Sequence, residues 1–146
     1  MSELTPTNSW TIDEGITDPS RFLPLLPSAF PDATLLCVEG SSIAQDVMAL
    51  YKAHRSRESN PSRRNTFFPT AHRIACTFSG ELFGSLVQLA DAHASHELLD
   101  HLAVFDGTRC LLEWHDAFAN ALMVDGDVPE ATVAALATPF GVAYSR

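Results

Sequence analysis

The chain has 146 residues, of which 46% are hydrophobic and 18% charged, and its formal net charge at pH 7 is −9. This length suits one domain with one core, and the composition excludes an intrinsically disordered chain. The acidic balance argues against a nucleic-acid-binding or membrane-surface protein, because both need a dominant positive field. The first residues lack the basic and apolar regions of a signal peptide, and no run of about 18 apolar residues follows. We therefore expect a cytoplasmic protein without a membrane segment.

Residues 1–32 predict an N-terminal arm that packs along the rest of the domain. They contain five of the nine prolines, which disfavour both a regular helix and a central strand. Their apolar side chains, such as Trp10 and Phe22, are too many for a free tail. We expect an extended arm on a single globular domain of residues 33–146. The arm could instead be exchanged between two copies of the chain, which leaves a homo-oligomer open.

Hydrophobic patterning predicts five strands and three helices after the arm. Short continuous apolar runs indicate buried strands, whereas apolar residues one helical turn apart indicate helices. Ser79 is placed to cap the second helix, and Asp106-Gly107 predicts a tight hairpin turn. In chain order we expect a strand at 33–39, a helix at 42–54, a strand at 73–79, a helix at 80–94, strands at 102–106, 109–118 and 121–124, and a helix at 127–138.

These elements predict a single two-layer domain of the α+β or α/β class. Its sheet is mixed and has about five strands, and its helices lie mainly on one face. The element order is then roughly β-α-β-α-β-β-β-α. The opposite face of the sheet is left free, so polar residues on that face are candidates for a functional surface.

Positive charge is concentrated in one window of the sequence. Six of the nine basic residues lie between residues 52 and 73, where only Glu58 opposes them, so this window carries +5. The rest of the chain has three basic and seventeen acidic residues, which gives −14. Residues 55–70 are rich in Ser, Asn, Arg and Pro and predict a long exposed loop, the kind of segment that often binds a ligand. Its candidate binding residues are Arg57, Arg63 and Arg64.

Glu113 and His115 are the candidate acid–base pair. Strand alternation places both side chains on one face, close enough for the carboxylate to orient the imidazole. Alternation also places Cys110, Leu112, Trp114 and Phe118 together on the opposite face. The pair is therefore a weak catalytic candidate and a candidate binding surface. The alternative is that both residues belong to the polar outer face of a half-solvated sheet.

A second cluster of ligand-type residues lies between residues 91 and 101. His93, His96 and Glu97 are close enough on a helix to meet at one metal ion. Their order matches neither H-E-x-x-H nor H-x-x-E-H, so no known arrangement of ligands and general base is present. They are weak metal candidates, and the alternative is the solvated face of a helix end. The cluster consists of Asp91, His93, His96, Glu97, Asp100 and His101.

The cysteines and glycines indicate no cofactor. Cys37, Cys76 and Cys110 lie in separate apolar stretches without C-x-x-C spacing, which predicts buried free thiols. Gly40-Ser41-Ser42 lacks the glycine pattern and the lysine of a phosphate-binding loop. We therefore expect no bound cofactor.

The sequence favours a binding protein over an enzyme. The acidic charge outside one loop, the small size and the lack of a catalytic motif predict a protein-binding module whose partner has a basic surface. Small intracellular inhibitors or immunity proteins that neutralise nucleases or toxins share this composition. The alternative is a small enzyme or metal-dependent hydrolase that uses the His/Glu residues above. A third interpretation is an assembly subunit that exchanges its N-terminal arm.

Overall fold

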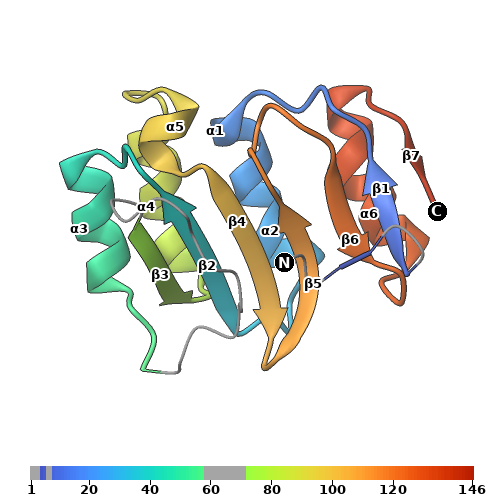
Figure 1. The fold of residues 1–146 in the computed structure, drawn as a ribbon, viewed down its shortest axis with the longest axis horizontal. Coiled ribbons are helices and arrows are strands. Elements are labelled where there is room, and N and C mark those ends of the chain that lie inside the picture. Colours follow the sequence, from blue (N-terminus) through green and yellow to red (C-terminus); the bar gives the residue numbers. More distant parts are fainter. Residues whose placement is uncertain (1–3, 6–7, 58–71) are drawn as a thin grey trace.

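The computed structural model describes residues 4–5, 8–57 and 72–146, which form an antiparallel sheet with helices packed on one face (Figure 1). The strands are β1 (Ser9–Ile12), β2 (Leu35–Gly40), β3 (His72–Thr77), β4 (His101–Asp106), β5 (Arg109–Trp114), β6 (Leu122–Asp125) and β7 (Tyr144–Ser145). The α-helices are α1 (Pro19–Phe22), α2 (Leu26–Ala29), α3 (Gln45–Ala53), α4 (Gly80–Ala90), α5 (Ser95–Leu98) and α6 (Glu130–Ala137). Short 3-10 turns, Leu23–Leu25 and Thr138–Phe140, follow α1 and α6.

The described strands make one seven-stranded sheet with the order β3-β2-β4-β5-β6-β1-β7. Each strand pair in it is antiparallel. The expectation of an α+β fold built on one sheet is confirmed. The expected mixed sheet of about five strands is wrong, because two further strands join it and no described pair is parallel.

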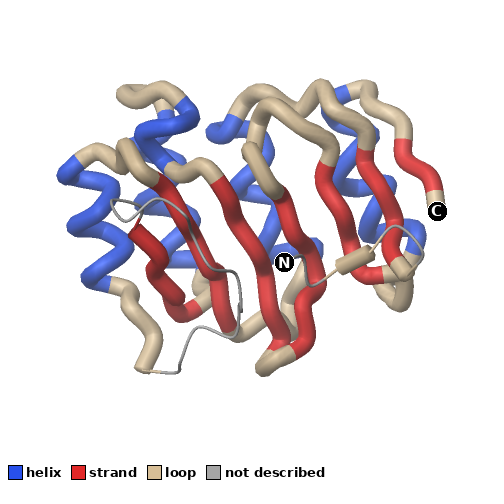
Figure 2. Tube along the Cα trace, viewed as in Figure 1, coloured by secondary structure: helices blue, strands red, loops and turns tan. Residues whose placement is uncertain are grey.

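Figure 2 shows the helices behind the sheet and the strands in front, so the molecule has two layers. The main core lies between these layers. Leu36, Val104 and Trp114 point into it from the strands and meet Phe22 and Leu86 from the helices, all of them 0% exposed. Burying apolar side chains on this scale is the main stabilising contribution to the fold. A smaller buried cluster that includes Leu35 and Phe105 lies on the opposite face, which carries none of the described helices and which we call the helix-free face.

The N-terminal segment is part of this fold and has regular structure. β1 lies between β6 and β7, and Trp10 Nε1 donates a hydrogen bond to the Val128 carbonyl at 3.0 Å. α1 and α2 pack Phe22 and Leu26 into the core. The expected extended arm without helix or central strand is corrected. The physical reason is that prolines begin these short helices, where a missing backbone N–H costs nothing.

A β-bulge interrupts the alternation of β5. Val104 pairs with Leu112 and Phe105 pairs with Cys110, so Leu111 has no partner of its own on β4. Cys110 consequently lies on the helix-free face, in a small apolar cluster with Phe105, whereas Leu112 lies in the main core. The expected common face for Cys110 and Leu112 is wrong because strict alternation holds only from Leu112 onward.

The structure contains both the helix cap and the hairpin that short sequence motifs predict. Ser79 Oγ accepts the Leu82 amide at 3.2 Å and caps α4. β4 and β5 form the expected tight hairpin, but its two turn residues are Gly107, with φ +61°, and Thr108, one residue later than predicted, because Asp106 still pairs with Arg109. Among the described helices, none has both the length and the apolarity that crossing a membrane needs.

Candidate functional site

Polar side chains form a row across the helix-free face where β4 begins. We define this polar row as Arg73, Glu39, His101 and His115. Glu39 on β2 is the direct cross-strand neighbour of Arg73 on β3 and of His101 on β4. Direct cross-strand neighbours point to the same face of a sheet, so these three side chains lie together. The ring of His115, just after β5, completes the row at 5.6 Å from the His101 ring.

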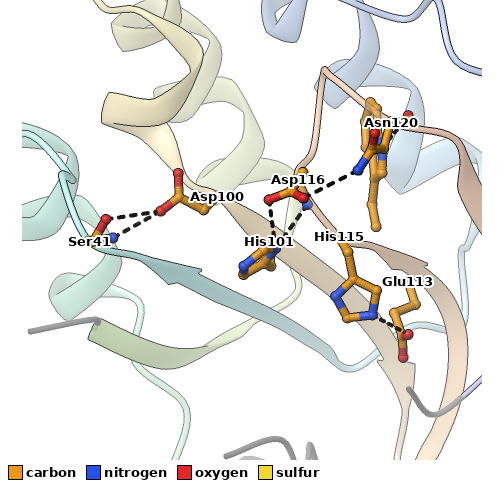
Figure 3. A network of polar contacts seen from close by, with 8 residues as sticks. Ser41, Asp100, His101, Glu113, His115, Asp116 and Asn120 are labelled. Atoms are coloured by element: carbon orange, nitrogen blue, oxygen red, sulfur yellow. Dashed lines mark hydrogen bonds and ion pairs between the residues drawn. The ribbon is translucent and has the colours of Figure 1, made fainter. Parts of the chain in front are cut away.

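Glu113 and His115 are brought together by strand alternation, as their spacing predicts. His115 Nε2 lies 2.6 Å from Glu113 Oε1, and the two side chains point toward one another in Figure 3. Glu113 is 4% exposed and His115 is 33% exposed at the side chain. An ionised carboxylate only accepts, so it orients the imidazole with the proton on Nε2. This is the geometry of an oriented imidazole, and its role in binding or catalysis stays a prediction.

A hollow of about 340 Å³ lies beside the polar row, between α5 and the loop that follows β5. We call it the acidic hollow because two carboxylates, Asp100 and Asp116, line it. Its volume is at the low end for small-molecule sites, which suits one side chain of a partner better than a large ligand. The full lining is Ser95, His96, Leu99, Asp100, Asp116, Ala117, Ala119 and Asn120.

Both carboxylates of the acidic hollow are positioned by hydrogen bonds. Asp100 Oδ2 lies 3.1 Å from the Ser41 amide and 3.3 Å from Ser41 Oγ, and both groups donate to it. Asn120 Nδ2 donates to Asp116 Oδ2 at 3.3 Å. The Ala117 amide donates to the Asp100 carbonyl at 2.8 Å, which ties the two sides of the hollow together. Figure 3 shows the contacts of Asp100 with Ser41 and of Asp116 with Asn120.

The loop from Asp116 to Asn120 has an unusual backbone. Asp116 has φ +48° and Phe118 has φ +69°, in the left-handed region that non-glycine residues rarely adopt. Phe118 is buried against Trp114, with ring centroids 4.6 Å apart, and the Trp114 indole donates to the Asn120 carbonyl at 2.8 Å. Surrounding contacts therefore hold the loop in a conformation that it would not adopt alone.

The three weak metal candidates are only partly brought together. His93 lies in the loop between α4 and α5, with Nδ1 3.8 Å from Glu97 Oε2. Its Nε2 contacts Asp46 on α3 at 2.9 Å, and His96 is exposed and lines the acidic hollow instead. The hydrogen bond with Asp46 raises the pKa of His93, as expected for an ion pair. The expected single helix through these residues is wrong, because α4 ends at Ala90.

Within the described ranges, no group of three or more His, Cys, Asp or Glu side chains is arranged to hold a metal ion.

Most of the predicted basic loop, residues 55–70, lies outside the described residues. Arg57 is exposed, while Arg63 and Arg64 lie outside the described residues. Their predicted part in binding stays a prediction.

The cysteines are free and buried, as the sequence predicts. Burial raises the pKa of Cys37 to about 12 and that of Cys76 to about 11. A thiol needs its ionised form to act as a nucleophile, so these two side chains are chemically inert at neutral pH.

Sequence reasoning missed Asp46, Asp116 and Asn120 as parts of the site. Asp46 reaches His93 from a different helix, a pairing for which the sequence carries no signal. For Asp116 and Asn120 the sequence does carry a signal for a turn, because Asp and Asn tolerate left-handed and turn backbone better than most residues. Asp100 and His101 belonged to the predicted cluster and do lie at this end of the sheet.

No protein-family model matches this chain, and neither the curated proteins nor the solved structures yield a match. The site is therefore interpreted from its own geometry and charge.

Proposed function

We propose that the protein is a protein-binding module that captures a basic side chain of its partner in the acidic hollow. One observation carries this proposal: Asp100 and Asp116, from two different connections of the sheet, line the same hollow. A guanidinium or ammonium group placed between two carboxylates would gain charge-assisted hydrogen bonds from both.

The acidic hollow is pre-organised for such a partner. Asp100 is held by Ser41, and the opposite side is held by the Ala117 amide. Because these contacts exist before binding, little conformational entropy is lost when a partner docks. The Asp116 side chain is 65% exposed, which gives a partner access to its carboxylate. Fixed and accessible carboxylates favour recognition by charge.

The net charge of −9 supports the same proposal at longer range. An acidic surface attracts a basic protein before contact and raises the association rate. Inhibitors or immunity-type proteins that neutralise a basic nuclease or toxin need this behaviour, and we include the chain in that functional class. Free, buried cysteines support action in a reducing compartment, and we propose the cytoplasm.

The test combines recovery of the partner with a charge-matched pair of variants. Tagged protein is recovered gently from its own cells and native mass spectrometry records any bound polypeptide. Asp100→Asn with Asp116→Asn should lose that polypeptide. The control, Asp32→Asn with Asp127→Asn, removes the same charge at exposed positions outside the hollow and should keep it.

Salt dependence gives a second readout of the same proposal. The association rate of the recovered partner should fall steeply with NaCl, because screening removes the long-range attraction. Equal binding by the hollow variant and the control variant would contradict the proposal. A rate that stays constant from low to high salt would contradict the electrostatic part of it.

A second candidate function is acid–base catalysis by His115. The observation that favours it is the 2.6 Å contact between His115 and the buried Glu113 carboxylate. Such a pair can hold an imidazole in position to accept or donate a proton. A screen of hydrolase substrates with the wild-type protein and His115→Ala tests it. Turnover that disappears in the variant would support catalysis, and no turnover in either protein would count against it.

A further inference from the structure

The His101 side chain connects β4 to the loop that completes the acidic hollow. The Asp116 amide nitrogen lies 2.9 Å from His101 Nδ1. A backbone N–H can only donate, so Nδ1 must be the acceptor and carries no proton. The neutral imidazole then has its proton on Nε2. This contact consequently requires His101 to be uncharged.

Three side-chain or backbone contacts from outside the loop hold Asp116–Asn120 in place. The Ala117 amide donates to the Asp100 carbonyl, and the Trp114 indole donates to the Asn120 carbonyl, each at 2.8 Å. The third is the contact of His101 with the Asp116 amide. Backbone amides, carbonyls and indoles keep their protonation state in the physiological pH range, whereas a histidine does not. Of these three contacts, only the one made by His101 can therefore respond to pH.

We infer that His101 is a pH-sensitive latch that anchors the Asp116–Asn120 loop when neutral and releases it when protonated. A proton taken from solvent onto Nδ1 occupies the lone pair that accepts the Asp116 amide, so this hydrogen bond is lost. The left-handed residues Asp116 and Phe118 depend on such contacts. The loop therefore becomes less ordered as the pH falls through the titration of His101.

Protonation also gives His101 a new preferred partner. Nδ1 lies 4.0 Å from Asp116 Oδ1, so a protonated ring can attract the carboxylate of the same residue whose amide it has released. That movement draws the Asp116 carboxylate away from the acidic hollow and adds a positive charge beside it. On the proposed function, on which this step rests, both effects weaken binding of a basic partner at low pH.

The described groups that face His101 set the strength of the latch. Glu39, its cross-strand neighbour on β2, favours the protonated ring, whereas Arg73 beyond it opposes protonation. The His115 ring, 5.6 Å away, opposes it when protonated itself, and Glu113 offsets the charge of His115. Asp116 and Asp100 add negative charge from the side of the hollow.

The latch is tested directly in the free protein by NMR. Long-range nitrogen–proton spectra of the imidazoles between pH 8 and pH 5 report the tautomer and the titration midpoint of His101. Hydrogen exchange over the same range reports the protection factor of the Asp116 amide. We expect an unprotonated Nδ1 at pH 8 and a fall in protection of about tenfold with the same midpoint, the size of one net hydrogen bond.

Two variants separate the latch from general acid sensitivity. His101→Asn places an amide oxygen near the position of Nδ1 and does not titrate, so protection of the Asp116 amide should persist at pH 5. His115→Asn removes the neighbouring imidazole and should shift the midpoint without abolishing the transition. A constant protection factor through the titration of His101 overturns the inference, as does an Nδ1 that already carries a proton at pH 8.

Partner binding distinguishes this inference from the proposed function. With the recovered polypeptide, affinity should fall from pH 8 to pH 5 in the wild type and stay level in His101→Asn. If the loop responds to pH but the hollow variants still bind the partner, the proposed function fails while the latch stands. If the hollow variants lose the partner and the loop shows no transition, the latch is wrong and the proposed function stands.

Discussion

His93 Nε2 lies 2.9 Å from Asp46 Oδ1, and this pair joins the connection between α4 and α5 to the first turn of α3. The mutual hydrogen bond raises the pKa of His93 above its ordinary 6.5 and lowers the pKa of Asp46 below its ordinary 3.8. The contribution of His93 to stability is therefore complete below pH 6.5 and is lost as the pH rises through its raised pKa. The contribution of Asp46 to stability is present above pH 3.8 and is lost as the pH falls through its lowered pKa.

We expect Asp46→Asn to lower the melting temperature most between about pH 4 and pH 6.5, and progressively less toward pH 8. Thermal unfolding of both proteins at intervals of half a pH unit measures this difference. Asp91→Asn is the control, because it removes an exposed carboxylate from the same region. A difference between wild type and Asp46→Asn that does not change with pH would show that the ion pair contributes nothing.

Two glycines should respond to alanine in opposite directions. A Cβ at Gly126 would lie 2.6 Å from the Asn8 carbonyl oxygen, whereas a Cβ at Gly84, inside α4, meets no atom within 4 Å. We expect Gly126→Ala to destabilise the fold by about 1–3 kcal/mol through forced backbone movement. Gly84→Ala should stabilise it by about 0.5–1 kcal/mol because alanine favours a helix. Urea denaturation of both variants checks the signs, and equal effects would be inconsistent with this packing.

Phe22→Ala tests whether α1 is part of the main core. Phe22 is 0% exposed, and its ring centroid lies 5.0 Å from that of Trp114. We expect a loss of about 3–5 kcal/mol in the free energy of unfolding, the usual cost of removing a buried aromatic ring. Leu25→Ala, at a half-buried neighbouring position, should cost less. A loss below about 1 kcal/mol at Phe22 would mean that α1 contributes little to the main core.

Ser79→Ala tests the cap of α4. Ser79 Oγ accepts the Leu82 amide, which otherwise has no partner within the first helical turn. We expect a loss of about 1 kcal/mol, measured by chemical denaturation. Ser42→Ala is the matched control, because Ser42 is exposed and lies outside any helix. Its effect should stay within about 0.5 kcal/mol, and a similar loss in both variants would argue against capping.

The sequence predicted the elements whose signals are local. The strands near residues 35–40 and 101–106 follow from apolar runs, and α4 follows from its Ser79 cap and its apolar periodicity. Glu113 and His115 met because alternation holds at that end of β5. These features depend on neighbours in the chain, so a single sequence carries them.

The rest of the fold depends on pairing between distant segments. β1 is only four residues long, and its partners lie on β6 and β7, so nothing near it in the sequence marks it as a strand. Pro19, Pro24 and Pro27 argued against helices, yet each lies at the start of a short helical turn. The bulge at Leu111 and the hollow between Asp100 and Asp116 arise only when the sheet assembles.

The position of β1 affects how the protein is made. Ser9 pairs with Asp125, and Ile12 pairs with Leu122 and Tyr144, so β1 can pair only after segments much later in the chain have been synthesised. Contacts of such long sequence separation slow folding, because a large chain loop must close before they form. Until then Trp10 and Ile12 are exposed on the nascent chain. The edge of β6 is also uncovered, and an unpaired strand edge beside apolar side chains is a site for chaperone binding or for aggregation.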